Sequence, residues 1–190
     1  MKTMSVLICT IPSRSGQFDK LQSSIMEKLY RYQLLDSVQV LVDRRVGVSI
    51  GQKRNNLLSQ SVGDYVAFID DDDDITEDYF LMCFKAIRGG FDSCYLRGII
   101  TWSGINPEIF EHSIKYRQYK TNENGCEVKY ERYPNHLNCI KREIAVVANF
   151  PDKSHSEDTE WATQIFVSGL IKSEYYDNKI MYNYQYEPNK

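Results

Sequence analysis

Three short apolar runs near the start of the chain, each followed by a segment with helical spacing, constrain the fold more than any other feature. The apolar runs occupy 5–10, 38–42 and 65–69. Apolar residues at helical spacing follow over 18–32, after Ser49 and after Thr76. Apolar strands that alternate with helices are typical of a mostly parallel sheet with both faces covered. The first 90 residues therefore predict an α/β fold with such a sheet at its centre.

Polar residues mark the expected starts of these helices. Asp19 is placed to cap the first helix and Thr76 to cap the third. Ser49 is followed three residues later by Gln52, which is the spacing of a capping box. Glycines are expected to end the second and third helices, at Gly63 and at Gly89-Gly90.

The second half of the chain has a less regular pattern. Residues 93–101 read as one strand, and 102–132 mix turn residues with aromatic ones, which indicates loops with room for a hairpin. Further along, the pattern predicts a strand at 136–140, a short helix at 141–148, a helix capped by Ser156 and an alternating strand at 179–186.

Composition narrows the class of protein. The 190 residues are enough for one domain, and the net charge of -3 does not favour a protein that grips nucleic acid by charge. Five cysteines without a C-x-x-C pair indicate reduced thiols, with Cys9 and Cys94 inside apolar strands. No apolar run approaches the roughly 18 residues that span a bilayer. We therefore expect a cytoplasmic protein without a transmembrane segment.

Polar groups gather where the three predicted strands end. Residues 10–14, Asp43 and the run Asp70 to Asp74 all follow a strand directly. In open α/β sheets, ligands bind outside the carboxyl ends of the strands. Five adjacent carboxylates repel one another, and a hard cation such as Mg²⁺ or Mn²⁺ relieves that repulsion. The alternative is a solvated acidic turn that caps the next helix.

Other well-known binding loops are absent from the sequence. An EF-hand loop counted from Asp70 would need glycine where Ile75 stands and glutamate where Leu81 stands. Neither a G-x-x-x-x-G-K-[ST] loop nor a G-x-G-x-x-G loop is present. If phosphates bind, a metal ion and basic side chains must hold them.

Several segments together resemble family-2 glycosyltransferases of the GT-A fold, including small bacterial and phage members. These segments are SVLICTIPSR at 5–14, SIGQKRNNLL at 49–58, GDYVAFIDDDD at 63–73, PNHLN at 134–138, and Ser156-Glu157-Asp158 followed by Trp161. The third segment contains a D-x-D signature, and the last is similar to the family's Glu-Asp motif at a helix start. The resemblance covers nearly the whole chain.

The resemblance implies a role for each matching residue. It implies a nucleotide pocket formed by Thr10, Pro12 and Arg14, with Asp43 on the base, Lys53 or Arg54 near the base or diphosphate, and Asp70 and Asp71 on the nucleotide. Asp72 would hold the metal together with Asp70, although five aspartates allow the register to shift to Asp71 and Asp73. Asp158 matches the general base, beside Glu157.

Histidines extend the set of candidate ligands. His136 is a candidate third metal ligand or acceptor contact, and His155 a candidate contact to the diphosphate or metal. Each of these, like His112, is more often a structural residue than a ligand.

These features predict one GT-A domain over 1–190, with a nucleotide-sugar half at 1–100 and an acceptor half at 101–190. The expected reaction is metal-dependent, inverting transfer of a hexose or pentose from a nucleotide sugar, most simply a UDP-sugar, to an acceptor hydroxyl. That hydroxyl would belong to a glycan or to a modified DNA base. The acceptor half carries basic residues interleaved with tyrosines, which suits an anionic glycan, a nucleic acid or a solvated loop: Lys115, Arg117, Lys120, Lys129 and Arg132.

Two other classes of function fit the same sequence. A nucleotidyltransferase also uses strand-end carboxylates and a metal, although Pro12 to Gly16 make a poor phosphate loop. A non-catalytic carbohydrate-binding or calcium-binding module would need no base, which leaves Glu157 and Asp158 without a chemical role. Hydrolysis of a donor without acceptor would separate a binding module from either enzyme.

Overall fold

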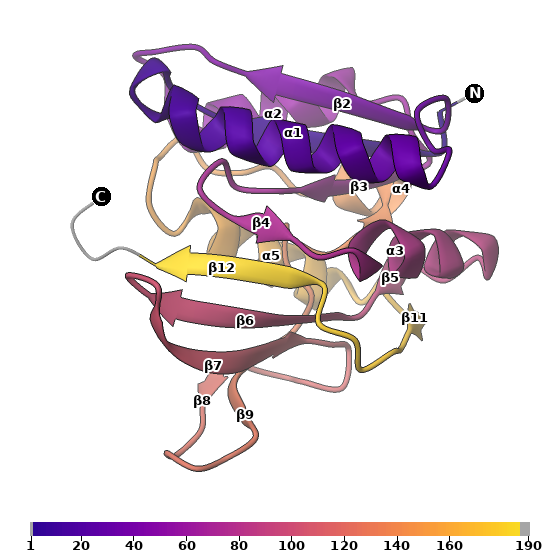
Figure 1. Cartoon of the computed structure of the whole chain (residues 1–190). Coiled ribbons are helices and arrows are strands. Elements are labelled where there is room, and N and C mark those ends of the chain that lie inside the picture. Colours follow the sequence, from indigo (N-terminus) through magenta and orange to yellow (C-terminus); the bar gives the residue numbers. More distant parts are fainter. Residues whose placement is uncertain (1, 187–190) are drawn as a thin grey trace.

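The protein contains two mixed sheets, and the second lies below the first in the view of Figure 1. The computed structural model describes residues 2–186. The first sheet has the strand order β11 (Glu174–Tyr175), β5 (Ser93–Cys94), β10 (Ile140–Lys141), β3 (Tyr65–Phe68), β1 (Met4–Cys9) and β2 (Val38–Asp43). Strands β2, β1 and β3 run parallel, as do β5 and β11, and β10 is antiparallel to both of its neighbours. This arrangement confirms the predicted, mostly parallel central sheet.

Helices cover both faces of the first sheet, which explains why its strands are apolar throughout. On one face, α1 (Ser15–Arg31) and α3 (Asp78–Arg88) pack on Val6 and Ile8 of β1. On the other face, α2 (Ile50–Gln60), α4 (Arg142–Ala145) and α5 (Glu157–Ser168) pack around Leu7. Figure 1 shows α1 and α3 in front of this sheet, with α2 and α5 behind it. Successive residues of β1 therefore belong to different halves of the core.

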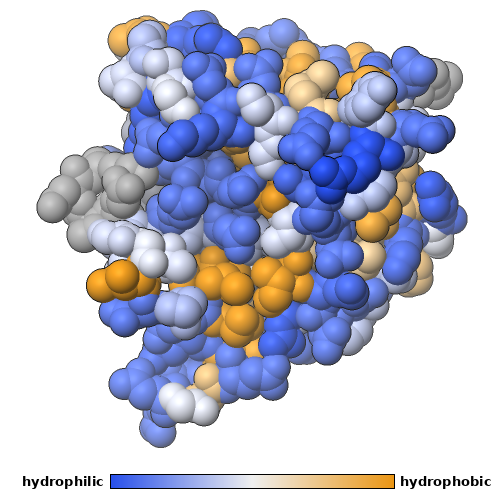
Figure 2. Space-filling view, in the orientation of Figure 1, coloured by the Kyte–Doolittle hydropathy of each residue, from blue (hydrophilic) through white to orange (hydrophobic). Residues whose placement is uncertain are grey.

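The second sheet lies beside the carboxyl end of the first. Its strand order is β4 (Asp74–Ile75), β12 (Tyr182–Tyr186), β6 (Leu96–Trp102), β7 (Ile105–His112), β9 (Val128–Arg132) and β8 (Lys120–Thr121). Strands β6 and β7 form the hairpin for which the sequence left room. Ile99 on β6 pairs with Ile109 on β7, and Figure 2 shows apolar side chains gathered over these two strands.

Several predicted boundaries differ from the structure. The predicted strand at 93–101 is two strands, because the chain leaves the first sheet after Cys94 and enters the second at Leu96. The predicted strand at 136–140 shortens to Ile140–Lys141, because residues 135–138 form a buried turn instead. Likewise, the helix expected over 141–148 spans only α4, and the strand expected from 179 begins at Tyr182.

The predicted caps were right in part. Ser49 is the N-cap of α2, and its hydroxyl accepts the backbone N–H of Gln52 at 3.1 Å. Asp19 caps nothing, because a short 3₁₀ turn, η1 (Pro12–Arg14), leads into α1 four residues earlier. Ser156 precedes α5 in a left-handed conformation and its side chain caps no N–H group. Thr76 accepts the N–H of Asp78, at the start of α3.

All five cysteines are free, with Cys94 buried and Cys9 half-buried. Within residues 2–186, none of the helices is both long and apolar enough to cross a membrane.

Gly51 allows the segment 151–153 to pack directly against the start of α2. Its N–H donates to the Lys153 carbonyl at 3.0 Å, and a Cβ atom there would lie 1.9 Å from the Pro151 carbonyl oxygen. Neither the helix backbone nor the Pro151 carbonyl can move away without breaking this contact. The close approach matters for function because the same segment leads into α5, which carries Glu157 and Asp158.

We predict that Gly51→Ala lowers the free energy of unfolding by about 1–3 kcal/mol, the usual cost of overpacking a close contact. Gly16→Ala is the matched control, because a Cβ atom on Gly16 in α1 would meet nothing within 4 Å. That control is expected to be neutral or stabilising by less than about 1 kcal/mol. Urea denaturation measures both, and equal stability of the two variants would contradict the contact.

Candidate active site

The aspartates of the acidic run alternate in exposure along the chain. Asp71 and Asp73 are buried, whereas Asp70, Asp72 and Asp74 are half-buried. Asp74 accepts from the Ser24 hydroxyl on α1 and pairs with β12 in the second sheet. The run therefore connects the end of β3 in the first sheet to β4 in the second, and its members face different partners.

Asp73 attaches the acidic run to strand β12 of the second sheet. It accepts the Tyr182 hydroxyl at 2.9 Å and the Gln185 backbone N–H at 2.9 Å. The Tyr182 oxygen in turn accepts the Asp70 backbone N–H at 3.2 Å. Burial and the nearby Asp70 charge raise the pKa of Asp73 well above its ordinary value. This carboxyl group holds the loop in place and faces away from solvent.

Asp71 binds the turn that follows β1. Arg14 of η1 donates to Asp71 at 2.9 Å, and the same guanidinium nitrogen lies 3.6 Å from Asp72. Burial raises the pKa of Asp71 even though Arg14 favours its ionised form. Arg14 therefore links the acidic run to the Thr10–Arg14 loop. These are two of the three strand ends that the sequence predicted to lie together.

Arg54 joins the acidic run to the start of α5. This guanidinium is only 5% exposed, and it donates to Asp70 at 2.9 Å and to Glu157 at 2.8 Å. Burial alone would raise the pKa of Asp70, but the Arg54 charge and His136 lower it below its usual range. Asp70 is therefore ionised. Arg54 carries out a connecting role here, although the sequence suggested contact with the nucleotide.

The two acids at the start of α5 point in different directions. Glu157 is 4% exposed and is engaged with Arg54. Asp158 has a 32% exposed side chain and faces the cavity described below. Only Asp158 can therefore reach a bound molecule. The structure separates a buried anchor from an accessible carboxylate within one adjacent pair.

His136 lies between the two accessible carboxylates. Its Nε2 atom is 3.5 Å from Asp70 and its Nδ1 atom is 3.8 Å from Asp158. The side chain is buried, and among the described residues neither nitrogen has a hydrogen-bond partner. Asn135 and Asn138 satisfy the backbone of this turn, which allows it to lie inside the protein. His155, in contrast, is exposed.

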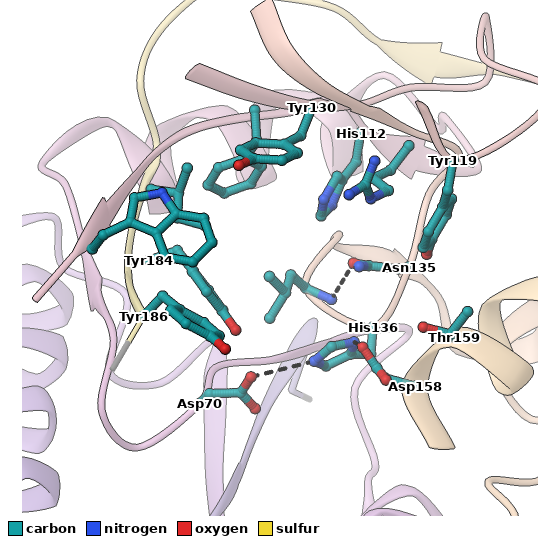
Figure 3. A pocket seen from close by; sticks show the side chains of 15 residues that line it. Asp70, His112, Tyr119, Tyr130, Asn135, His136, Asp158, Thr159, Tyr184 and Tyr186 are labelled. Carbon is teal, nitrogen blue, oxygen red and sulfur yellow. Dashed lines mark hydrogen bonds and ion pairs between the residues drawn. The ribbon is translucent and has the colours of Figure 1, made fainter. Parts of the chain in front are cut away.

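A cavity of about 370 Å³ opens between the two sheets in front of these groups. Figure 3 shows Asp70, His136 and Asp158 on one side of it, with His112, Tyr119 and Tyr130 across from them. Tyr184 and Tyr186 of β12 close a third side. The remaining lining residues are Ile100, Trp102, Phe110, Arg132, Asn135, Leu137 and Thr159. Most of this surface is aromatic, which suits the flat faces of sugar rings.

The sequence suggested little of this aromatic wall. The sequence showed aromatic residues over 102–132 without singling out those that line the cavity, and Asn135 and Thr159 carried no signal of their own. The alternation of Tyr182, Tyr184 and Tyr186 was the available clue, because it places three tyrosines on one face of a strand. Tyr182 faces the acidic run, and the other two line the cavity.

His112 is the second histidine of the cavity. Burial and the neighbouring His136 and Arg132 lower its pKa to about 3, so its imidazole is neutral at pH 7. Its Nδ1 atom lies 3.2 Å from the Asn138 side-chain oxygen. It therefore contributes shape and hydrogen bonding, with no charge, to the wall that faces the acids.

A second cavity, of about 310 Å³, lies beside the end of β1. Thr10, Pro12 and Phe18 line it, together with Ile11, Ser15 and Arg44. The Arg44 guanidinium lies 4.5 Å from the centre of the Phe18 ring. Two of the three residues predicted for a nucleotide pocket therefore line this cavity, and the third, Arg14, follows Pro12 on η1.

Asp43 and Lys53 are both buried at the edge of the first sheet. Asp43 accepts from Arg45 and from the Asn56 side chain, and these bonds lower its pKa although burial opposes them. Lys53 donates to the Thr10 carbonyl at 2.7 Å. In this arrangement both residues support the loops that surround the second cavity.

The donor atoms at this edge fit a divalent cation that shares its ligands with a substrate. Residues 2–186 contain no group of three or more His, Cys, Asp or Glu side chains placed to hold a metal by themselves. Mg²⁺ is usually bound through one or two carboxylates, with phosphates and water completing its shell. Asp70 and Asp72 supply two such carboxylates, and the bare His136 nitrogens lie beside Asp70.

Comparison with known proteins identifies the fold. No protein-family model matches the sequence, and a search of curated proteins found no similar sequence. Among solved structures, S. aureus TarS residues 1–349 bound to UDP-GlcNAc superposes with a TM-score of 0.62 at 13% identity. The same fragment bound to UDP gives 0.62 at 18% identity. GalNAc-T7 with UDP, GalNAc and Mn²⁺ gives 0.57 at 15% identity and is covered over 44% of its length.

These likenesses extend over nearly all of the present chain, from 98% to 100%. The chain spans about 60% of the TarS fragment. The structural neighbours are GT-A glycosyltransferases, and the chain has the GT-A fold that its motifs predicted.

We predict that Arg54→Met lowers the free energy of unfolding by about 3–5 kcal/mol, because it leaves the Glu157 carboxylate buried without a partner. Adding Glu157→Gln to that variant removes the unpaired charge and should restore part of the loss. Arg31→Gln is the control, since Arg31 forms only exposed ion pairs, with Glu27 and Glu77, and such a pair is worth about 0–1 kcal/mol. Chemical denaturation tests this, and an Arg54→Met variant as stable as the control would contradict it.

Proposed function

We propose that this protein is a metal-dependent, inverting glycosyltransferase of family-2 type that transfers a sugar from a UDP-sugar to an acceptor hydroxyl. One observation carries the proposal. An ionised strand-end carboxylate, Asp70, and an accessible carboxylate, Asp158, face the same aromatic cavity, and Arg54 ties together the segments that bear them. The GT-A fold and neighbours solved with UDP or UDP-GlcNAc support it.

The nucleotide is proposed to bind along residues 1–100 and the acceptor along 101–190, within a single domain. Thr10 and Pro12 line a cavity large enough for a base, and Arg14 lies between that cavity and the acidic run. Asp43 and Lys53 would act there by shaping the loops as well as by contact. Asp71 would contribute by holding Arg14.

Asp72 and Asp70 are the proposed ligands of Mn²⁺ or Mg²⁺, with His136 as a further candidate. The burial pattern favours this register over Asp71 and Asp73, whose carboxylates are buried and engaged with Arg14 and with β12. The cation would stabilise negative charge on the departing diphosphate. Arg14 lies at the same edge, 3.6 Å from Asp72, and its side chain is one-third exposed.

Asp158 is the proposed general base. It would accept the proton of the acceptor hydroxyl as that oxygen forms a bond to the anomeric carbon. The bond from this carbon to the diphosphate oxygen breaks at the same time, and UDP leaves from the opposite face. His136 lies against Asp158 and Asp70 and would keep the two carboxylates apart. Glu157 would act only through Arg54.

The donor site is tested by calorimetric titration of UDP with and without Mn²⁺. We expect Mn²⁺ to tighten UDP binding, and Asp72→Asn to remove most of that gain. Loss of an outer-shell partner alone costs about 10–100-fold in metal affinity, so loss of a direct ligand should cost at least as much. Asp74→Asn is the control, because Asp74 is engaged with Ser24 on α1.

The possible results of this titration separate the alternatives. Binding of another nucleotide in place of UDP would change the donor class. Release of pyrophosphate from a nucleoside triphosphate would indicate a nucleotidyltransferase. If no nucleotide binds in the presence of metal, the protein is a binding module and the proposed function is wrong.

The base is tested with Asp158→Asn, which should lower the rate of sugar transfer by about 10²–10⁴-fold, the range for loss of a general base. Release of UDP from UDP-sugars, with water as the acceptor, measures this rate before the natural acceptor is known. UDP affinity should be unchanged. Glu160→Gln is the control, because Glu160 is exposed on the same helix and pairs with Lys153. Substantial turnover by Asp158→Asn would refute the assignment.

A further inference from the structure

Arg132 is an arginine of the 370 Å³ cavity that has no carboxylate partner within residues 2–186. It lies at the end of β9 and is half-buried. Its Nη1 atom donates to the Lys120 and Glu131 backbone carbonyls at 2.9 and 3.0 Å. Across residues 2–186, no ion pair and no other hydrogen bond of this guanidinium occurs within the protein. Burial lowers the pKa of Arg132, and no nearby carboxylate offsets this effect.

Three other arginines around the active site pair with acids: Arg14 with Asp71, Arg45 with Asp43, and Arg54 with both Asp70 and Glu157. Arg44, beside the second cavity, is exposed to solvent. A partly desolvated cation without a counter-ion is costly, and such a charge is normally paired. Within residues 2–186, Arg132 is therefore the half-buried arginine of this site that has no acid partner, and it lines the cavity.

The acids nearest to Arg132 in sequence and across the sheet are committed elsewhere. The Glu131 side chain accepts from the Asn122 amide at 3.0 Å. Glu111, which pairs with Glu131 across β7 and β9, accepts from Arg97, Lys115 and Tyr116. The described part of this wall therefore offers Arg132 no ion-pair partner.

Two tyrosine rings hold the guanidinium in place. Arg132 lies 4.7 Å from the centre of the Tyr119 ring and 5.4 Å from that of Tyr130, within the range of cation–π attraction. The Tyr119 hydroxyl is buried and close to Asn135, yet it makes no hydrogen bond of acceptable geometry with the described residues. A second unsatisfied polar group therefore borders the same cavity next to the unpaired charge.

The position of Arg132 and its two tyrosines indicates which groups a ligand of this cavity must carry. Figure 3 shows Tyr119 and Tyr130 across the cavity from Asp70 and Asp158. Between the two walls lie the aromatic faces of Tyr184, Tyr186 and Trp102. A molecule that spans the cavity would meet carboxylates at one end and an unpaired cation at the other. The volume of 370 Å³ is near the lower limit of small-molecule sites, about 300–1,000 Å³, so the part inside is small.

We propose that the acceptor carries an anionic group, a phosphate or a carboxylate, that binds Arg132 while its reacting hydroxyl reaches Asp158. This inference rests on the proposed function, since it names the acceptor class for that site. Arg132 would bind the anion with its remaining N–H groups. Neutral His112 on the same wall adds no competing charge.

Three matched probes test this proposal: glucose, glucose 6-phosphate and glucuronate. They share a ring and differ in bearing no charge, a phosphate or a carboxylate. Binding is followed by tryptophan fluorescence, because Trp102 lines the cavity and Trp161 is buried in the core. Titrations are run with and without saturating UDP and Mn²⁺. The two charged probes report separately on a phosphate and a carboxylate.

At least one charged probe should bind about tenfold or more tightly than glucose, as expected for a charge-assisted hydrogen bond. Arg132→Gln should remove that preference and leave glucose and UDP binding unchanged. Arg117→Gln is the matched control, because Arg117 is exposed and lies outside this cavity. It should keep the preference.

The results distinguish this inference from the proposed function. Equal binding of all three probes, no binding of either charged probe, or a preference that survives in Arg132→Gln would each overturn the anionic acceptor. UDP binding would then still support a transferase. Conversely, an Arg132-dependent preference without any UDP binding would support the anion site and refute the donor assignment.

Discussion

The buried guanidinium of Arg54 is the interaction on which the arrangement of the active site depends. It joins an aspartate that ends a strand of the first half of the chain to a glutamate that begins a helix of the second half. The aromatic rings of Phe68 and Phe150 lie 5.7 and 5.6 Å from it, so the three charges meet in a largely apolar setting. Arg54 can donate to both carboxylates only if the segments that carry Asp70 and Glu157 are both in place. The bridge therefore specifies the relative position of Asp70 and Asp158 more than it adds to stability.

The acidic run shows how a repulsive sequence becomes an ordered loop. Each carboxylate has a different environment: Arg54 and His136 for Asp70, Arg14 for Asp71, β12 for Asp73 and α1 for Asp74. Repulsion is reduced because residues 70–73 form a turn, closed by the hydrogen bond from the Asp73 N–H to the Asp70 carbonyl, that directs the carboxylates toward different partners. Asp70 and Asp72 are left on the half-exposed side, where a cation and a diphosphate could reach them. Buried carboxylates that hold the loop, Asp71 and Asp73, thus alternate along the run with the more accessible Asp70 and Asp72.

Local periodicity was sufficient to predict the first half of the fold, and long-range pairing decided the rest. The strands near residues 5, 38 and 65 and the helices after them follow from apolar spacing, as does the edge where Thr10, Asp43 and Asp70 meet. Nothing local marks Tyr95 as the point where a continuous apolar run changes sheets. Similarly, the pairing of Arg54 with Glu157 spans 103 residues. Adjacent acids such as Glu157 and Asp158 look alike in sequence, and only the helix orientation separates the anchor from the accessible group.

Different strands of the second sheet hold the acidic run and line the cavity. Strand β12 is the last described strand along the chain, and in the sheet it lies between β4 and β6. There Tyr182 and Gln185 donate hydrogen bonds to Asp73 of the acidic run. Its next inward-facing tyrosines, Tyr184 and Tyr186, line the cavity. The strand that steadies the acidic loop is therefore also a wall of the neighbouring cavity. Changes on β7 and β9, which lie farther from that loop, can alter the cavity wall with little effect on it. Arg132, which has no acid partner within residues 2–186, is held there because β9 pairs with β7 and the rings of Tyr119 and Tyr130 lie against its guanidinium.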